Sequence, residues 1–303
     1  SLIKSAVAVA LGQIIAAPAQ AAVLTVNSLL DDTTPSNGQC TLREAIISVN
    51  DGEINNDCSA VVPGTLDQIV FAPSIGASST ISLTQGSLLV TSDVSITGPT
   101  PGGPSNLRIH QDGSARVMSI IGSDPITPMR VTLDNLTISG GSSSEGGGAL
   151  LVRSNVEVSI TNSQISDNRA ASYGGGISID LGSQVSLTSS YLAGNTAGSY
   201  GGGIDVYDNS TLIVDDSLIS SNTAGTVGGA VSMSSSTASI DNRSKLTFNY
   251  AGDHGGGLYL NSSSVTMSNL SSISYSAAAG GNGGGVEMRN SSFLELLTSA
   301  HIY

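Results

Sequence analysis

The chain of 303 residues contains no tryptophan, and charged side chains make up only 11% of it. Lysine and arginine together number 10, against 23 aspartates and glutamates, so the formal net charge is −13. The basic residues are scattered singly along the chain, whereas a nucleic-acid-binding surface needs clustered lysine and arginine. The composition therefore argues against nucleic acid as a partner and favours a soluble protein that is repelled by anionic surfaces.

Long apolar stretches are also missing after the first residues. Residues 1–21 indicate a secretory signal, with a positive start at Lys4, a short apolar run at 6–16 and a small-x-small cleavage site at 19–21. That run is too short and too interrupted to span a bilayer. We therefore expect an exported protein, extracellular or on the outer cell surface, without a transmembrane segment in this chain. The absent initiator methionine suggests that a few residues are missing at the front.

Cysteine and histidine are scarce, with two and three residues respectively. Cys40 and Cys58 lie close together in the sequence, and no histidine lies near them. This arrangement disfavours a zinc site, and in an exported protein an isolated pair of this kind predicts a disulfide. We predict no metal and no cofactor, and a role for calcium is left open.

Against these absences stands a repeating unit of about 27 residues, which recurs from position 138 to position 285 and marks an internal repeat. One apolar column recurs at Ile138, Ile165, Leu192, Ile219, Leu246 and Ile273. An asparagine follows three positions after four of these, at Asn168, Asn195, Asn222 and Asn249. A glycine cluster comes next, at 174–176, 201–203, 228–229 and 255–257. Independent columns that stay in register over four units indicate a solenoid.

The pattern inside each unit is that of β-strands. Apolar residues alternate with serine, threonine or aspartate, as at 185–188 and 212–215, and no helical spacing appears. One unit cannot bury its apolar face alone, but stacked units can pair parallel strands coil upon coil. We predict an all-β fold, a right-handed parallel β-helix with about 27 residues and three short strands in each coil. The apolar columns then become interior ladders.

The asparagine and glycine columns suit the corners of such coils. Stacked asparagines can hydrogen-bond to one another along the axis, and asparagine tolerates a left-handed backbone. Glycine clusters allow positive φ and close contact between coils. We therefore interpret Asn168, Asn195, Asn222 and Asn249 as structural residues rather than as ligands for a substrate.

The region before the repeats carries the one convincing helix after the signal. Residues 42–50 have apolar side chains at helical spacing, with Thr41 as the N-cap and Gly52 at the stop. A solenoid must cover its first coil, so we predict that this helix and the disulfide form an N-terminal cap. The expected divisions are the signal at 1–21, the cap at 22–64, irregular first coils at 65–137 and regular coils at 138–303. The pattern stops without a polar cap, so we expect the protein to continue.

The same region resembles a known family. The stretch 40–46, Cys-Thr-Leu-Arg-Glu-Ala-Ile, is similar to the Cys-Ser-Leu-Arg-Glu-Ala motif near the start of many exported bacterial β-helix proteins. Gly-Gly-Ala-Leu at 147–150 and Gly-Gly-Ala-Val at 228–231 resemble the repeats of polymorphic outer-membrane autotransporters. Their companion Phe-x-x-Asn motif appears here only with Ile or Leu in place of Phe, as at 219–222. The resemblance implies the fold and export, but a fold does not fix a chemistry.

An enzyme on a pectin-lyase-like β-helix, either a polysaccharide lyase or a hydrolase, is the main alternative. A glycosidase needs two carboxylates across the scissile bond, and a calcium-dependent lyase needs several acids on adjacent coils. Asp215 and Asp216 form the only adjacent acidic pair inside the repeats, and we find no acids in the same columns of the neighbouring coils. The other acids of the repeats appear isolated in the sequence: Asp180, Asp205, Asp208, Asp241 and Asp253. We therefore predict no catalytic residues.

One column suggests recognition. Tyr173, Tyr200 and His254 precede successive glycine clusters, with Val227 interrupting the series. Tyrosines stacked along one face can present flat apolar surfaces to sugar rings. The alternative is that they shield the glycine corner. We predict a non-enzymatic exported protein with an adhesin-like or structural role, and its partner is a surface glycan or a protein of a host or partner cell. A third hypothesis is a self-assembling filament subunit, because open solenoid ends can stack.

Overall fold

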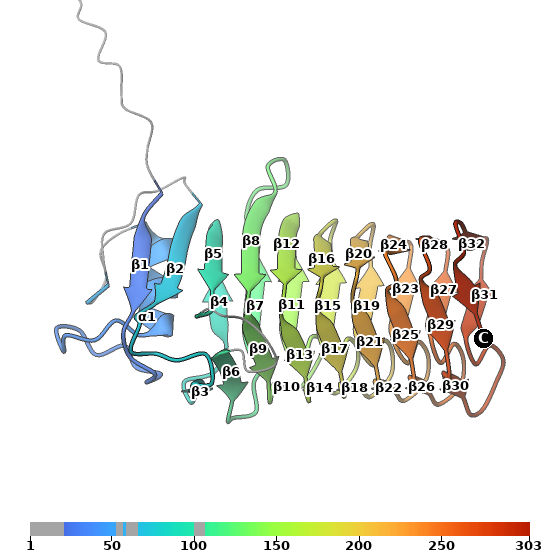
Figure 1. Cartoon of the computed structure of the whole chain (residues 1–303), viewed down its shortest axis with the longest axis horizontal. Coiled ribbons are helices and arrows are strands. Elements are labelled where there is room, and N and C mark those ends of the chain that lie inside the picture. Colours follow the sequence, from blue (N-terminus) through green and yellow to red (C-terminus); the bar gives the residue numbers. More distant parts are fainter. Residues whose placement is uncertain (1–20, 53–56, 59–65, 100–106) are drawn as a thin grey trace, which may run out of the picture.

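The computed structural model describes residues 21–52, 57–58, 66–99 and 107–303. Parallel strands stack coil upon coil along one long axis, and the helix covers the first coils (Figure 1). The solenoid has about 8 turns of about 27 residues each, as the repeat predicts. The expected signal at 1–21 falls almost entirely outside the described residues.

Each regular coil contributes one strand to each of four sheets, which we number in the order below. Sheet 1 contains β1 (Val23–Val26), β2 (Asp67–Phe71), β5 (Val94–Thr97), β8 (Met129–Asp134), β12 (Val156–Thr161), β16 (Gln184–Thr188), β20 (Thr211–Asp215), β24 (Thr237–Asp241), β28 (Ser264–Met267) and β32 (Phe293–Leu296). Sheet 2 contains β3 (Thr80–Leu83), β6 (Leu107–Gln111), β9 (Leu136–Ser139), β13 (Gln164–Ser166), β17 (Tyr191–Ala193), β21 (Leu218–Ser220), β25 (Lys245–Thr247), β29 (Ser272–Ser274) and β33 (His301–Ile302). Sheet 3 contains β4 (Leu88–Val90), β7 (Met118–Ile121), β11 (Leu150–Arg153), β15 (Ile177–Asp180), β19 (Ile204–Tyr207), β23 (Val231–Ser234), β27 (Leu258–Asn261) and β31 (Val286–Arg289). Sheet 4 contains β10 (Ser142–Ser143), β14 (Arg169–Ala170), β18 (Thr196–Ala197), β22 (Thr223–Ala224), β26 (Tyr250–Ala251) and β30 (Ala277–Ala278).

Sheet 4 was not expected, because the repeat predicts three strands per coil. Its strands are very short and lie between the asparagine and the glycine cluster. Such short strands cannot show the alternation by which a strand is recognised in a sequence.

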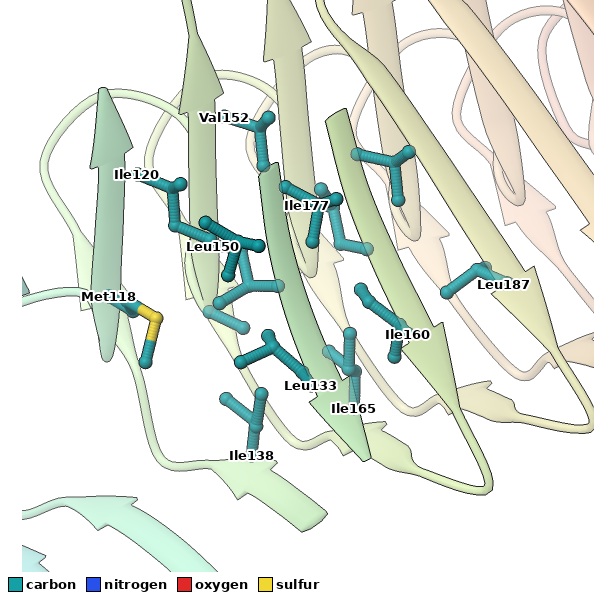
Figure 2. Packing of buried hydrophobic residues seen from close by; sticks show 14 of the residues in the cluster. Met118, Ile120, Leu133, Ile138, Leu150, Val152, Ile160, Ile165, Ile177 and Leu187 are labelled. Atoms are coloured by element: carbon teal, nitrogen blue, oxygen red, sulfur yellow. The ribbon is translucent and has the colours of Figure 1, made fainter. Parts of the chain in front are cut away.

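The interior is filled by the apolar columns. Ile177 pairs in register with Leu150 on the preceding coil and with Ile204 on the next, so that side chains of one kind stack along the axis. Figure 2 shows side chains such as Met118, Leu150 and Ile160 directed into the space between the sheets. Full burial of a Val, Leu or Ile side chain contributes about 1.5–3 kcal/mol, so a core repeated over every coil supplies most of the favourable free energy.

The asparagines form a hydrogen-bonded ladder at the turn between sheets 2 and 4. All four are buried, with no more than 2% of any of them exposed. The Asn195 side-chain amide donates to Oδ1 of Asn222 at 3.0 Å and to the Ile165 carbonyl at 3.1 Å. The backbone N–H of Asn195 donates to the same Asn222 Oδ1 at 3.0 Å. Each asparagine side chain thereby satisfies a buried carbonyl and a buried N–H of the preceding coil.

Serine ladders occupy two further turns and were not predicted. The backbone N–H of Ser190 donates to the Ser217 hydroxyl at 3.0 Å, and that of Ser217 donates to the Ser244 hydroxyl at 3.2 Å. A second ladder links Ser210 to Ser236 and Ser236 to Ser263 in the same way. These serines recur once in each coil, but serine is so frequent in the chain that the columns do not stand out.

The glycine clusters form the tightest corner. The first glycine of each cluster has positive φ, which is 60° at Gly201. The second has no room for a side chain, because a Cβ at Gly202 would lie 2.4 Å from the carbonyl carbon of Thr223 on the next coil. Positive φ and close approach between coils are therefore both required there.

The predicted helix near the N-terminus and the predicted disulfide are confirmed. Helix α1 (Leu42–Asp51) begins at the N-cap Thr41, whose hydroxyl accepts from the Glu44 backbone, and it ends at Gly52 in the left-handed region. Cys40 and Cys58 form the predicted disulfide. Arg43 pairs with Asp31 at 2.6 Å. Because the same guanidinium donates to two carbonyls of the first coils, it ties the helix to the solenoid. Among the described residues no helix combines the length and apolarity that crossing a membrane requires.

The asparagine ladder gives a stability prediction. Asn195→Leu and Asn222→Leu are each expected to lower the free energy of unfolding by about 2–4 kcal/mol, because each leaves buried backbone groups without partners. Urea unfolding followed by circular dichroism measures the change. Asn282→Leu, the same replacement at an exposed site, is the control and should leave the midpoint unchanged. An unchanged midpoint in the two ladder variants would contradict the structural role of these asparagines.

Candidate functional site

The outward face of sheet 3 carries an unusual set of polar and aromatic side chains. In β15, β19, β23 and β27 the first and third residues are apolar and point into the core. The second and fourth point outward and stack in two columns. One column contains Ser178, Asp205, Ser232 and Tyr259, and the other contains Asp180, Tyr207, Ser234 and Asn261.

A hollow of about 700 Å³ opens on this face. Its walls include Tyr173, Tyr200, Tyr207 and Tyr259, and Asp205 lies among them. We call this feature the tyrosine groove. Further hydrogen-bonding groups come from Thr226, Ser232, Ser234, Asp253 and Asn261.

The structure brings two of the three predicted binding residues into the groove. Tyr173, Tyr200, Val227 and His254 pair in register on successive coils at the glycine corner. Tyr200 is 49% exposed, and the Tyr173 ring meets the Tyr207 ring edge to face at 6.0 Å. Val227 is buried and lines the same groove.

His254 continues the column but turns to other partners. Its Nδ1 accepts from the backbone N–H of Asn282 at 3.2 Å, and its Nε2 lies 3.0 Å from Arg289. Its neighbour Asp253 lines the groove. Of the three predicted binding residues, Tyr173 and Tyr200 therefore line the groove, whereas His254 lies beyond its end.

Asp205 is the most unusual titratable group of the groove. It is 7% exposed, and a hydrogen bond from Ser232 is the stabilising contact of its carboxyl. Burial raises its pKa to about 7; the Ser232 bond lowers the pKa, and the nearby Asp180 carboxylate raises it further. Near neutral pH Asp205 therefore exists partly in its protonated form, which can act as a hydrogen-bond donor.

Asp180 lies on the neighbouring coil and is held in a network. It is fully buried, although it points away from the core. Arg153, its partner on β11, reaches the carboxylate at 2.6 Å, and the Tyr207 hydroxyl donates to it at 2.5 Å. The hydrogen bond from Arg153 to Asp180 raises the pKa of that guanidinium. The network fixes one wall of the groove, because Tyr207 is held at both its ring and its hydroxyl.

The prediction that the acids of the repeats are isolated was wrong for Asp180 and Asp205. They lie on adjacent coils of one face, close enough for one charge to affect the other. They were missed because they occupy different columns, two positions apart along the strand. Both acids occupy an outward-facing position, the second or the fourth residue, of the strand that follows a glycine cluster. A comparison of these two positions across the coils could have found them.

The prediction for Asp215 also needs a correction. Asp215 pairs in register with Asp241 on the next coil, because the intervening coil is one residue shorter than its neighbours. This half-buried pair lies at the ends of β20 and β24. Asp241 accepts from Ser268 at 2.8 Å and from Asn269 at 2.6 Å, and these bonds lower its pKa. Asp216 is exposed and lies 3.7 Å from Arg243.

Metal ligands do not gather in the described part of the chain. Within those residues no group of three or more histidine, cysteine, aspartate or glutamate side chains is placed to hold a metal ion. The groove offers hydroxyls, amides and carboxyls in place of such a cluster.

Comparison with known proteins establishes the family. A family model described as a right-handed β-helix region matches residues 105–269, more than half of the chain. The chain therefore belongs to this family, and the predicted right-handed parallel β-helix is confirmed. No curated protein and no solved structure gave a significant match. The fold accommodates many chemistries, so function has to be argued from the groove itself.

Asp205 gives a prediction for the pH dependence of stability. Because its folded-state pKa lies above the unfolded value, its stabilising contribution is complete below about pH 4 and is lost as the pH rises through 7. The free energy of unfolding should fall by about 3 kcal/mol between pH 4.5 and 7.5 from this residue.

Urea unfolding at the two pH values measures this change. Asp205→Asn should remove most of the difference in the free energy of unfolding. Asp208→Asn, at the exposed position directly after β19, should keep that difference. Equal pH dependence in the chain and in Asp205→Asn would show that Asp205 is not protonated in the folded protein.

Proposed function

We propose that this chain is an exported or cell-surface protein that binds a glycan chain in the tyrosine groove. The observation that carries the proposal is the set of four tyrosines around a polar floor in a hollow that is open to solvent. Aromatic rings offer flat apolar faces to sugar rings, and a few well-placed polar groups orient a ligand.

The spacing of the rings suits a polymer that runs along the axis. Tyr207 and Tyr259 belong to coils that are two apart, which is about 10 Å along the axis. That distance is roughly the length of a disaccharide. Ser234 and Asn261 supply hydroxyl and amide groups between and beside the rings. A glycan laid along the groove would therefore meet Tyr207 and Tyr259 about two sugars apart.

Export is supported by three features. The Cys40–Cys58 disulfide belongs to an oxidising environment. The acidic, sparsely charged composition and the signal-like stretch at 1–21 point the same way. An adhesin-like role follows, since a long rigid solenoid can present one binding face well away from its point of attachment.

A glycan array followed by calorimetric titration of the hits tests the proposal. Tyr200→Ala and Tyr259→Ala should each weaken binding by roughly fivefold, because each removes a stacking contact of about 1 kcal/mol. Tyr191→Ala is the matched control, since this tyrosine is 57% exposed but lies on sheet 2. Silence of the unaltered chain on every glycan, or equal losses in Tyr191→Ala, would reject the groove as the binding site.

Glycoside hydrolysis is the second candidate, and the raised pKa of Asp205 favours it. A general acid that is protonated near neutral pH can donate to a leaving glycosidic oxygen. Asp253, two coils further on, is the other carboxyl group of the groove and lies about 10 Å away along the axis. The axial component alone already exceeds the roughly 6.5–9.5 Å used by inverting glycosidases, so the spacing of the two carboxyls counts against hydrolysis.

Hydrolysis ranks second because Asp180, the carboxylate on the coil next to Asp205, is not free to act as the second catalytic carboxylate. It is buried and engaged with Arg153 and Tyr207. A reducing-end assay on the glycans that bind separates the two candidates. New reducing ends that disappear in both Asp205→Ala and Asp253→Ala would establish the hydrolase. Intact glycans after prolonged incubation would leave binding as the function.

A further inference from the structure

We propose that the tyrosine groove selects uncharged glycan segments and rejects polyuronates, with the Asp205 carboxyl hydrogen-bonded to a sugar hydroxyl. This inference rests on the proposed glycan binding, and it names the class of glycan that the groove takes. Three features of the groove support it.

The first feature is the sign of the charges. Among the described residues, those that line the groove include two acids, Asp205 and Asp253, and no lysine or arginine. A uronate carboxylate would lie in the groove without a cation to pair with, and Asp253 would add a like charge beside it. Burial of an unpaired charge is costly, and like charges add to that cost. The net charge of −13 acts in the same direction at longer range.

The second feature is that two guanidinium groups, one at each end of the groove, are already engaged. At one end of the groove, Arg153 reaches Asp180 at 2.6 Å. At the other end, Arg289 lies over the Tyr259 ring at 5.9 Å and pairs with Glu287 at 3.2 Å. Recruiting either guanidinium to a ligand carboxylate would break an existing ion pair, and in the case of Asp180 it would strand a fully buried carboxylate.

The third feature is the surroundings of the Asp205 side chain. On one side β15 presents Ser178 and Asp180, on the other β23 presents Ser232, and Tyr207 follows on β19 itself. Tyr173 and Tyr200 line the groove on the side of the glycine corner. Ser178 is fully buried, and among the described residues its hydroxyl has no hydrogen-bond partner. Asp180 is the only charged group of this set, and it repels a second negative charge.

A ligand over the groove would bury Asp205 more deeply. Deeper burial disfavours the charged carboxylate further, so the complex should prefer the protonated acid. The acid has one O–H to donate, and a sugar hydroxyl or ring oxygen can accept it. Binding of a neutral glycan should therefore be coupled to protonation of Asp205.

The test compares neutral and acidic oligosaccharides on the purified chain by calorimetry. The neutral probes are hexaoses of glucose, mannose and N-acetylglucosamine, and the acidic probes are hexagalacturonate and hexamannuronate. At least one neutral hexaose should bind, and both uronates should bind at least tenfold more weakly. Affinity for the neutral ligand should fall roughly tenfold between pH 6 and pH 8, as the protonated fraction falls.

Two variants separate protonation from other effects of pH. Asp205→Asn carries an uncharged donor at every pH and should show the same affinity at pH 6 and pH 8. Asp208→Asn, which lies outside the groove, should keep the tenfold fall. Tighter binding of a uronate, or a neutral ligand whose affinity does not change with pH, overturns this inference and leaves glycan binding in place. Failure of every oligosaccharide at both pH values overturns the proposed function as well.

Discussion

Registration of each coil upon the next is the constraint on which the rest of the structure depends. A parallel strand leaves half of its hydrogen-bonding groups for the coil above and half for the coil below, so no coil is stable alone. The Asn195–Asn222 contact shows how the register is kept at the turns, because one side-chain oxygen accepts from both the backbone and the side chain of the preceding coil. A slip by one residue would break these bonds and turn the interior column outward.

That constraint acts on the inside and at the corners, and it leaves the outward positions free to vary. On sheet 3 this freedom is used for tyrosines and for two buried acids. Asp205 is not needed for stacking, and its burial lowers stability at neutral pH. A group that destabilises its own fold and faces a solvent-filled hollow suits a binding role better than a structural one.

The sequence predicts the solenoid well, because the features that define it repeat. The regular period, the asparagine ladder and the glycine corner each recur several times, so each copy supports the others. The cap is also predictable, since Thr41, Glu44 and Gly52 form local capping signals. Sheet 4 and the serine ladders were missed, because very short strands and frequent residues give no distinctive pattern.

The groove is predictable only in part, because its residues do not repeat. Tyr173 and Tyr200 were found through their shared column. Asp180, Asp205, Tyr207 and Tyr259 each occur once in their position, and only the three-dimensional register brings them together. The shortened coil that aligns Asp215 with Asp241 shows the same limit, since a single missing residue shifts a column that a fixed period cannot follow.

The most direct test of the account is a crystal structure of the chain with a bound neutral hexasaccharide. We predict that the sugar runs along the solenoid axis on sheet 3, with rings over Tyr207 and Tyr259 and a hydroxyl within hydrogen-bond distance of the Asp205 carboxyl. A sugar found on another face of the solenoid, with the tyrosine groove empty, would contradict the central claim.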